Sequence, residues 1–161
     1  MVADRGELSS LPTGGDHKST RYLQGRALQP AFSPDGRWMA YAADESGSWE
    51  VFVQSVPAGR GKWKISNHGG AQPVWRRDGK ELFYIGGAQI FGEKIFAVRV
   101  NTGASFEVGV PKELFDVQTS GFYYFRRHYS VTPDGQRFLV NEGVDDHPST
   151  ILLQNWLSPA R

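Results

Sequence analysis

The sequence predicts an all-β fold built from a repeated antiparallel unit, and three observations support this prediction. The 161 residues include 19 glycines and 9 prolines, well above their usual combined share of about 12%, and 13% of the residues are aromatic. An Asp-Gly pair lies between two apolar runs at three places in the chain. Strand-like alternation of apolar and polar residues follows these pairs. Short strands joined by tight turns account for all three features.

The repeat itself is visible in the spacing of the Asp-Gly pairs. Asp35 and Asp78 are 43 residues apart, and Asp78 and Asp134 are 56 residues apart. A four-stranded propeller blade takes about 40 to 45 residues, so the second unit carries a longer insertion. Glycine supplies the positive φ that a tight hairpin needs, which makes these aspartates turn residues and not catalytic ones. The three copies span residues 30–41, 73–84 and 129–140.

Further strands are expected after each hairpin, in the same order. In the first unit residues 49–54 alternate as a third strand, and residues 62–66 form a more polar fourth one. The third unit ends with its third strand, whereas an isolated outer strand at residues 20–24 precedes the first unit. Residues 1–19 show no periodicity and are expected to be a flexible linker or a disordered lead. The remaining strands are expected at 94–100 and 111–115 in the second unit and at 150–156 in the third.

The three copies resemble the WD40-like repeats of TolB-type β-propellers. The similarity rests on Ser-Pro-Asp-Gly at 33–36, Arg-Asp-Gly at 77–79 and Thr-Pro-Asp-Gly at 132–135, and covers about residues 20–156. The strings 72–75 (Gln-Pro-Val-Trp) and 152–156 (Leu-Leu-Gln-Asn-Trp) are similar to the C-terminal half of propellers attached to bacterial serine/threonine kinases. The resemblance implies a six-bladed ring for protein or ligand binding, without catalytic residues in most members.

This chain has half the blades of such a ring. Four-stranded blades are expected at about 30–66, 73–116 and 128–156, within a domain of residues 20–161. Three blades cannot close, because each sheet of a propeller buries its faces against two neighbours. We therefore predict a homodimer in which two half-propellers form six blades, with the strand at 20–24 of each chain completing a blade of its partner. The alternative is that the sequence is the C-terminal half of a longer chain.

Composition excludes several classes of function. The formal charge of +1 gives no electrostatic basis for binding nucleic acid or an anionic membrane. The absence of cysteine excludes disulfides, thiolate nucleophiles and cysteine-ligated metals. Apolar runs such as 39–43 are too short to span a bilayer, and residues 1–4 do not begin a signal peptide. We expect a soluble protein, cytoplasmic as written, or periplasmic if it belongs to a larger membrane receptor.

Candidate ligand-binding residues lie in the loops at one rim. The loops that follow the outer strands share this rim with the hairpins between second and third strands, whereas the Asp-Gly turns lie on the opposite rim. Propeller geometry brings such side chains together at the mouth of the central channel. The alternative is that these are solvated loop residues with local turn roles. The candidates are Asp44, Glu45, His68, Arg126, Arg127, His128, Asp146 and His147.

No motif for catalysis, a metal or a cofactor is present. The four histidines form neither a His-x-x-x-His pair nor a helical two-histidine motif. The string 103–107 lacks the second glycine of a Gly-x-Ser-x-Gly elbow. The aromatic segment 121–129 is either packing between blades or protomers, or a recognition surface. No cofactor is therefore expected.

The sequence favours a non-catalytic β-propeller interaction module that binds a protein or small ligand at the loop-rich channel face. Two alternatives remain open. One is a hydrolase with an active site in the channel between protomers, and the other is the sensor portion of a larger receptor or kinase.

Overall fold

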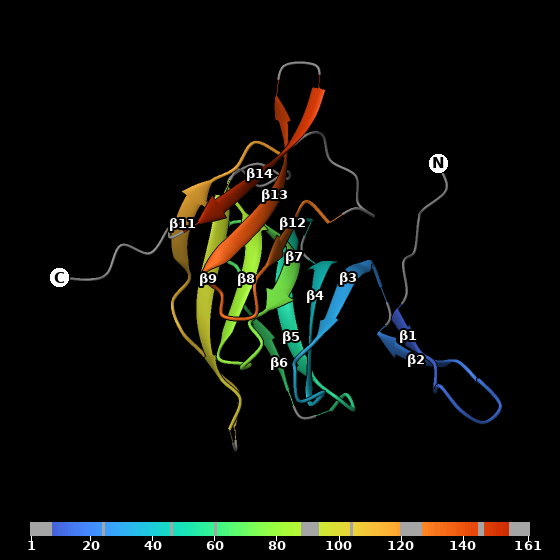
Figure 1. The fold of residues 1–161 in the computed structure, drawn as a ribbon. Coiled ribbons are helices and arrows are strands. Elements are labelled where there is room, and N and C mark those ends of the chain that lie inside the picture. Colours follow the sequence, from blue (N-terminus) through green and yellow to red (C-terminus); the bar gives the residue numbers. More distant parts are fainter. Residues whose placement is uncertain are drawn as a thin grey trace.

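A computed structural model describes residues 8–23, 25–45, 47–59, 61–87, 94–103, 105–119, 127–144 and 147–154. All regular elements in these ranges are β-strands, which confirms the all-β prediction. The described residues contain no helix that is long and apolar enough to span a bilayer. The strands form three antiparallel sheets and a small hairpin (Figure 1).

The first sheet has the strand order β3-β4-β5-β6, and neighbouring strands are antiparallel. The second has the order β10-β9-β8-β7, with β11 also paired to β9. The third has the order β12-β13-β14. The three sheets thus follow the order of the three sequence repeats.

The strands of the first sheet are β3 (Ala27–Phe32), β4 (Trp38–Asp44), β5 (Trp49–Ser55) and β6 (Lys62–Lys64). Those of the second are β7 (Gly70–Trp75), β8 (Glu81–Gly86), β9 (Lys94–Asn101), β10 (Glu107–Val108) and β11 (Lys112–Asp116), and those of the third are β12 (Tyr129–Val131), β13 (Arg137–Val144) and β14 (His147–Gln154).

The three Asp-Gly pairs form the predicted hairpin turns between the first two strands of each sheet. Gly36, Gly79 and Gly135 have φ angles of 69°, 70° and 74°, in the left-handed region that glycine adopts readily. In each turn the aspartate carboxylate accepts a hydrogen bond from the backbone N–H two residues further on. We call the end of the sheets that carries these turns the turn end, and the opposite end the loop end.

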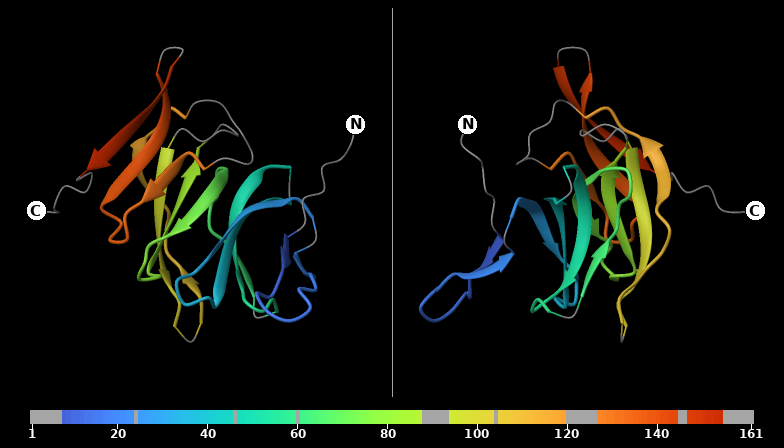
Figure 2. Two further views of the ribbon diagram at one scale, coloured as in Figure 1. Left: turned by 45° about the vertical axis from the view of Figure 1, so that its right-hand side comes forward. Right: turned by 180° about the vertical axis from the view of Figure 1, so that it is seen from behind.

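The sheets pack face to face, as Figure 2 shows, and apolar side chains fill the two spaces between them. Between the first and second sheets lie Trp38, Val53, Trp75 and Leu82, with further residues of the same cluster. Alternate residues of the second sheet face the third sheet, where the buried rings of Phe83 and Phe138 meet edge to face at 5.1 Å. The period-2 alternation of the strands therefore supplies one core for each pair of sheets.

The N-terminal hairpin covers the outer face of the first sheet. It pairs β1 (Leu8–Ser10) with β2 (Thr20–Leu23). Its apolar residues, with Tyr22 among them, pack against a buried cluster that includes Met39 and Tyr41. The Tyr22 hydroxyl also donates a hydrogen bond to the carbonyl of Ser55. Figure 2 shows the hairpin beside this sheet, on the side away from the second sheet.

This hairpin differs from the flexible linker expected over residues 1–19. Periodicity could not reveal β1, because a three-residue strand is too short to show a pattern. Leu8 is held by packing on the first sheet, which is a tertiary contact. In this chain β2 pairs with β1, and its predicted pairing with a blade of a second copy stays a prediction.

Candidate functional site

The first strands of the three sheets, β3, β7 and β12, lie next to one another along one side of the molecule (Figures 1 and 2). The three strands belong to different sheets, so side-chain hydrogen bonds join them and not the backbone pairing of a sheet. The indole Nε1 of Trp75 donates to the carbonyl of Ala31 at 3.0 Å, and the hydroxyl of Tyr129 donates to the carbonyl of Gln72 at 2.8 Å. We call the exposed side of these three strands the inner-strand surface.

Two glutamines at equivalent positions of the repeat shape this surface. Gln29 and Gln72 each precede a proline, and their φ angles are 55° and 56°. Side chains other than glycine rarely adopt this left-handed conformation. In both strands the pairing register shifts across the same segment, so each glutamine belongs to a β-bulge. A bulge redirects the side chain it carries, and here both glutamines reach into the hydrogen-bond network of the inner strands.

The redirected amides link the three sheets in sequence. The backbone N–H of Gln72 donates to Oε1 of Gln29 at 2.8 Å, which joins the first and second sheets. Oε1 of Gln72 in turn accepts from the backbone N–H of His128 at 2.7 Å, which joins the second and third. Nε2 of Gln72 lies 2.6 Å from Nδ1 of His128. Gln72 and His128 are both buried, so the bonds between these two residues are shielded from water.

This geometry determines the hydrogen-bonding role of the His128 ring. The backbone N–H of His128 orients the Gln72 amide with its oxygen inward, so the amide nitrogen faces Nδ1. An amide NH₂ can only donate, and Nδ1 must therefore be the unprotonated acceptor. His128 is thus a buried structural link in this network. Burial also raises the pKa of the neighbouring Tyr129 hydroxyl far above its ordinary value.

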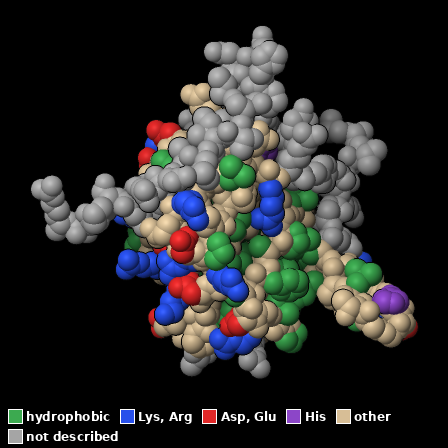
Figure 3. Space-filling view, in the orientation of Figure 1, with side chains coloured by type: hydrophobic (Ala, Val, Ile, Leu, Met, Phe, Trp, Pro, Cys, Tyr) green, Lys and Arg blue, Asp and Glu red, His purple; other side chains and the backbone are tan. Residues whose placement is uncertain are grey.

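The inner-strand surface exposes apolar side chains outside this buried network. Phe32 at the end of β3 is 59% exposed. It pairs in register with Met39 of the outer-face cluster, so it lies where the inner-strand surface meets the outer face of the first sheet. Pro30 on the same strand is also exposed. Val74 on β7 and Val131 on β12 are half-buried and pack against the core between the second and third sheets. Figure 3 shows hydrophobic side chains gathered over β3 and beside the N-terminal hairpin. An exposed aromatic on a surface held by buried hydrogen bonds is typical of a binding site.

The predicted loop residues occupy separate surroundings in the structure. Oδ2 of Asp44 pairs with Nη1 of Arg26 at 3.1 Å, and its Oδ1 is buried with no hydrogen-bond partner among the described residues. Glu45 pairs with Lys62. Both carboxylates therefore contact cations near their own sheet.

The other candidates lie closer to the second and third sheets. His68 is exposed, with Nδ1 3.1 Å from Oδ1 of Asn67. Arg127 is exposed and its Nη1 lies 3.4 Å from the carbonyl of Pro73. Arg126 and Asp146 fall outside the described residues, as does the side chain of His147, the first residue of β14. Their predicted ligand-binding role stays a prediction.

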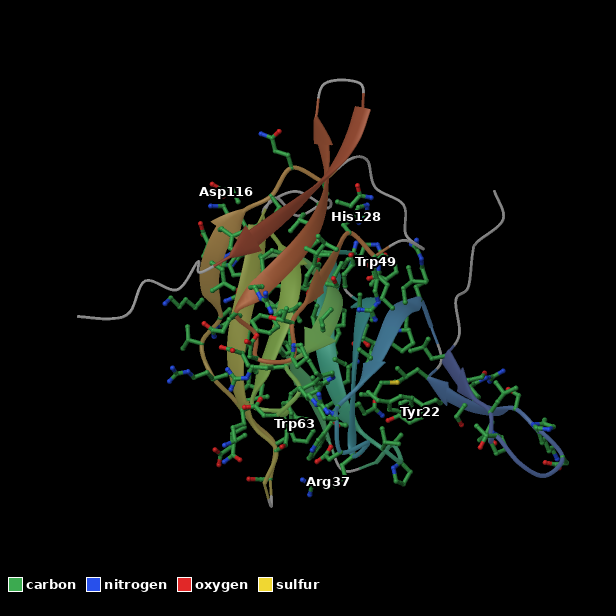
Figure 4. The ribbon with its side chains drawn as sticks, in the orientation of Figure 1. Tyr22, Arg37, Trp49, Trp63, Asp116 and His128 are labelled. Atoms are coloured by element: carbon green, nitrogen blue, oxygen red, sulfur yellow. The ribbon has the colours of Figure 1, made fainter. Side chains whose placement is uncertain are left out.

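Figure 4 separates the two ends of the molecule. His128 and Trp49 lie toward the loop end, and Arg37 lies at the turn end. The guanidinium of Arg26 stacks over the Trp49 ring at 5.4 Å from its centre. Within the described part of the chain, no group of three or more His, Asp or Glu side chains is placed to hold a metal ion.

Comparison with solved structures identifies the fold. A chain of a nidogen/laminin complex superimposes with a TM-score of 0.61 at 13% identity, over 93% of this chain and 55% of that one. A protein assigned as TolB from Agrobacterium tumefaciens gives a TM-score of 0.57 at 16% identity, over 93% of this chain and 57% of that one. The chain has a TolB-like β-propeller fold. It spans about half the length of these structures.

At these identities the likeness concerns the fold alone. No family model and no curated protein sequence matches the chain. The resemblance of the Asp-Gly repeats to TolB-type propellers is thereby confirmed at the level of fold, and function has to be argued from the site.

Gln29 and Gln72 were not among the residues singled out from the sequence as candidates. The available signal was their shared position before Pro30 and Pro73, which aligns with His128 before Tyr129 in the third repeat. Sequence reasoning assigned His128 to an exposed rim, whereas the structure buries it. The Gln72 amide explains the difference, because it satisfies the polar groups of His128 in the interior.

Proposed function

We propose that this chain is a non-catalytic β-propeller interaction module that binds a protein partner through the inner-strand surface. The observation that carries the proposal is the exposure of Phe32, at 59%, on strands joined by the buried Gln29–Gln72–His128 network. Aromatic side chains supply much of the binding energy in protein interfaces, where their burial removes a large apolar area from water.

The hydrogen bonds that join the strands beneath this surface support this role. Gln72 is 2% exposed and bonds to groups of both neighbouring sheets. A partner that docks on these strands therefore meets a preorganised surface and does not have to order it, which reduces the entropic cost of binding. His68 and Arg127 are exposed nearer the loop end and would extend the contact there.

The site can be tested with peptides selected for binding to the native chain from a displayed random library. The dissociation constant of each selected peptide is then measured for the native chain and for Phe32→Asp. We expect the substitution to weaken most selected peptides about tenfold or more, because it places a charge where apolar contact is needed.

Leu11→Asp is the matched control, because Leu11 is 63% exposed and lies in the loop of the N-terminal hairpin. Its binding should equal that of the native chain. Selected peptides that bind Phe32→Asp as tightly as the native chain would show that the inner-strand surface is not the binding site. Circular dichroism of both variants verifies that the fold is retained.

The hydrolase and sensor alternatives remain predictions. Turnover of ester or peptide substrates, lost on substitution of His68 or His147, would support a hydrolase. A kinase domain and a membrane span encoded upstream in the parent gene would support a sensor.

A further inference from the structure

A cleft of about 990 Å³ lies at the turn end of the second sheet, away from the Gln72–His128 network at the loop end. Its walls come from the Asp-Gly turns of the first two sheets, the end of β9 and the start of β11. Pockets that bind ligands usually enclose about 300 to 1,000 Å³, so the cleft is large enough for several residues of a peptide. We call it the turn-end cleft.

The lining of this cleft is predominantly cationic. Five cationic side chains face two carboxylates, those of Asp78 and Glu81. Figure 3 shows Lys and Arg side chains gathered over β9, β11 and the turns below them. The five cations are Arg37, Arg76, Lys80, Arg99 and Lys112.

Internal partners neutralise only part of this charge. Arg76 pairs with Asp78 and with Glu81, each at 2.8 Å, so both carboxylates of the cleft are engaged by one guanidinium. Arg37 pairs with Asp35 at 2.7 Å, outside the cleft lining. Arg99 and Lys112 are exposed, and neither forms an ion pair in the described part of the chain. They provide two positive charges on adjacent strands that a ligand can neutralise.

The cleft also offers apolar contact. Ala97, Val100 and Leu114 contribute to its lining, and Val110 at its edge is 88% exposed. The residue before Val110 lies close to β9, because the N–H of Gly109 donates to the carbonyl of Arg99 at 2.8 Å. A Cβ at position 109 would lie 2.9 Å from that carbonyl oxygen. Glycine thus permits the close approach of this segment to β9.

We propose that the turn-end cleft binds an acidic peptide segment that carries an aliphatic side chain. Carboxylates of the peptide would pair with Arg99 and Lys112, and Arg99 can bind a carboxylate through two parallel N–H bonds. The aliphatic side chain would contact Val110 and Leu114. A nucleic acid is a poorer fit, because Asp78 and Glu81 interrupt the basic surface and the formal charge of the chain is only +1.

Fluorescence anisotropy with labelled synthetic peptides tests this proposal. One peptide alternates glutamate with leucine, a second alternates glutamate with serine, and a third alternates lysine with leucine, all of equal length. The native chain should bind the glutamate–leucine peptide most tightly. Its affinity should fall on raising the salt from about 50 mM to about 500 mM, because screening weakens the ion pairs.

The double variant Arg99→Glu/Lys112→Glu should weaken binding of the glutamate–leucine peptide about tenfold or more, because it reverses both unpaired charges. Arg99→Ala/Lys112→Ala should give a smaller loss. Lys18→Glu is the charge-matched control, since Lys18 is an exposed residue of the N-terminal hairpin loop. It should bind as the native chain does, and circular dichroism checks that every variant is folded.

Three results would overturn the proposal. The first is that the glutamate–leucine peptide binds the native chain and the double Glu variant equally well. The second is that the native chain prefers the lysine–leucine peptide. The third is that tripolyphosphate binds as tightly as the glutamate–leucine peptide. The last would identify a site for any polyanion. Phe32→Asp should leave binding of the glutamate–leucine peptide unchanged, so failure of this proposal is distinguishable from failure of the inner-strand site.

Discussion

Gln29 and Gln72 adopt a backbone conformation that costs energy, yet both repeats contain it. Their φ angles of 55° and 56° lie in the left-handed region, and such a conformation persists only when surrounding contacts stabilise it. Here those contacts are the hydrogen bonds that pass from Gln29 through Gln72 to His128. The same interactions that join the sheets therefore also offset the backbone strain that places the amides.

Substitution of Gln72 tests how much this network contributes to stability. Gln72→Ala keeps a Cβ, and hence a similar backbone strain, but leaves the N–H and Nδ1 of buried His128 without their partner. We expect the free energy of unfolding to fall by about 1 to 3 kcal/mol. Urea denaturation measures the change. Gln136→Ala, at an exposed position, should be nearly neutral, and an equally small effect of Gln72→Ala would contradict the assigned role.

At the scale of single elements, the Asp-Gly turns connect neighbouring sheets as well as neighbouring strands. The backbone N–H of Arg77 donates to the carbonyl of Pro133 at 3.2 Å, which joins the turn of the second sheet to that of the third. A Cβ at Gly135 would lie 2.9 Å from Cδ of Arg76 and 3.1 Å from the Phe83 ring. Glycine is thus required at position 135 for its φ and for close packing between sheets.

The carboxylates of these turns hold hydrogen bonds that depend on their charge. Partial burial on its own would raise the pKa of Asp35, but hydrogen bonds from Ser33 and Arg37 outweigh it and lower the pKa below its ordinary value. The pKa of Asp78 is lowered chiefly by the Arg76 side chain.

The third turn behaves in the same way. A hydrogen bond from the Thr132 hydroxyl, 2.5 Å from Oδ1 of Asp134, is the main cause of the lowered pKa of that carboxyl. All three aspartates therefore release their protons more readily in the folded chain than in the unfolded chain.

Acid should consequently destabilise the fold through its turns. A lowered folded pKa gives stability that is complete above the unfolded value of about 4 and is lost as the pH falls through the folded value. We expect the free energy of unfolding to decline as the pH falls below about 4. The variant Asp35→Asn/Asp78→Asn/Asp134→Asn should show a shallower decline in denaturant titrations. An unchanged slope would mean that other groups cause the acid sensitivity.

At the scale of the whole molecule, the two outer sheets present different surfaces. The β1–β2 hairpin covers the outer face of the first sheet. In the third sheet, β14 pairs with β13 on one side and with no strand on the other among the described residues. An edge strand of this kind offers backbone donors and acceptors to an added strand.

We propose that two copies combine their sheets into a closed ring as a homodimer. The hairpin would then have to leave the face it covers, so that β2 can pair with β14 of the second copy. Light scattering after size exclusion, over a dilution series, should give twice the mass of 17.9 kDa. A concentration-independent mass of one chain would contradict the dimer. The β1–β2 hairpin would then be a permanent cover of the outer face of the first sheet.

The parts of the fold that depend on local chemistry could be predicted from the sequence. The turns at Asp35, Asp78 and Asp134 were predictable because glycine at the next position can adopt a positive φ without steric cost. The strands around them were predictable because alternation reports which side chains face a core. Their spacing then indicated the propeller fold that the structural comparison supports.

The contacts between sheets could not be predicted in this way, because they depend on how the sheets pack. Gln72 and His128 are 56 positions apart, and their contact depends on how two sheets pack, which no local pattern encodes. The same holds for Leu8 on the first sheet and for the turn-end cleft, where the Asp-Gly turns, β9 and β11 converge. Strand and turn formation follows from neighbouring residues, whereas burial and pairing between sheets follow from the packing of the whole chain.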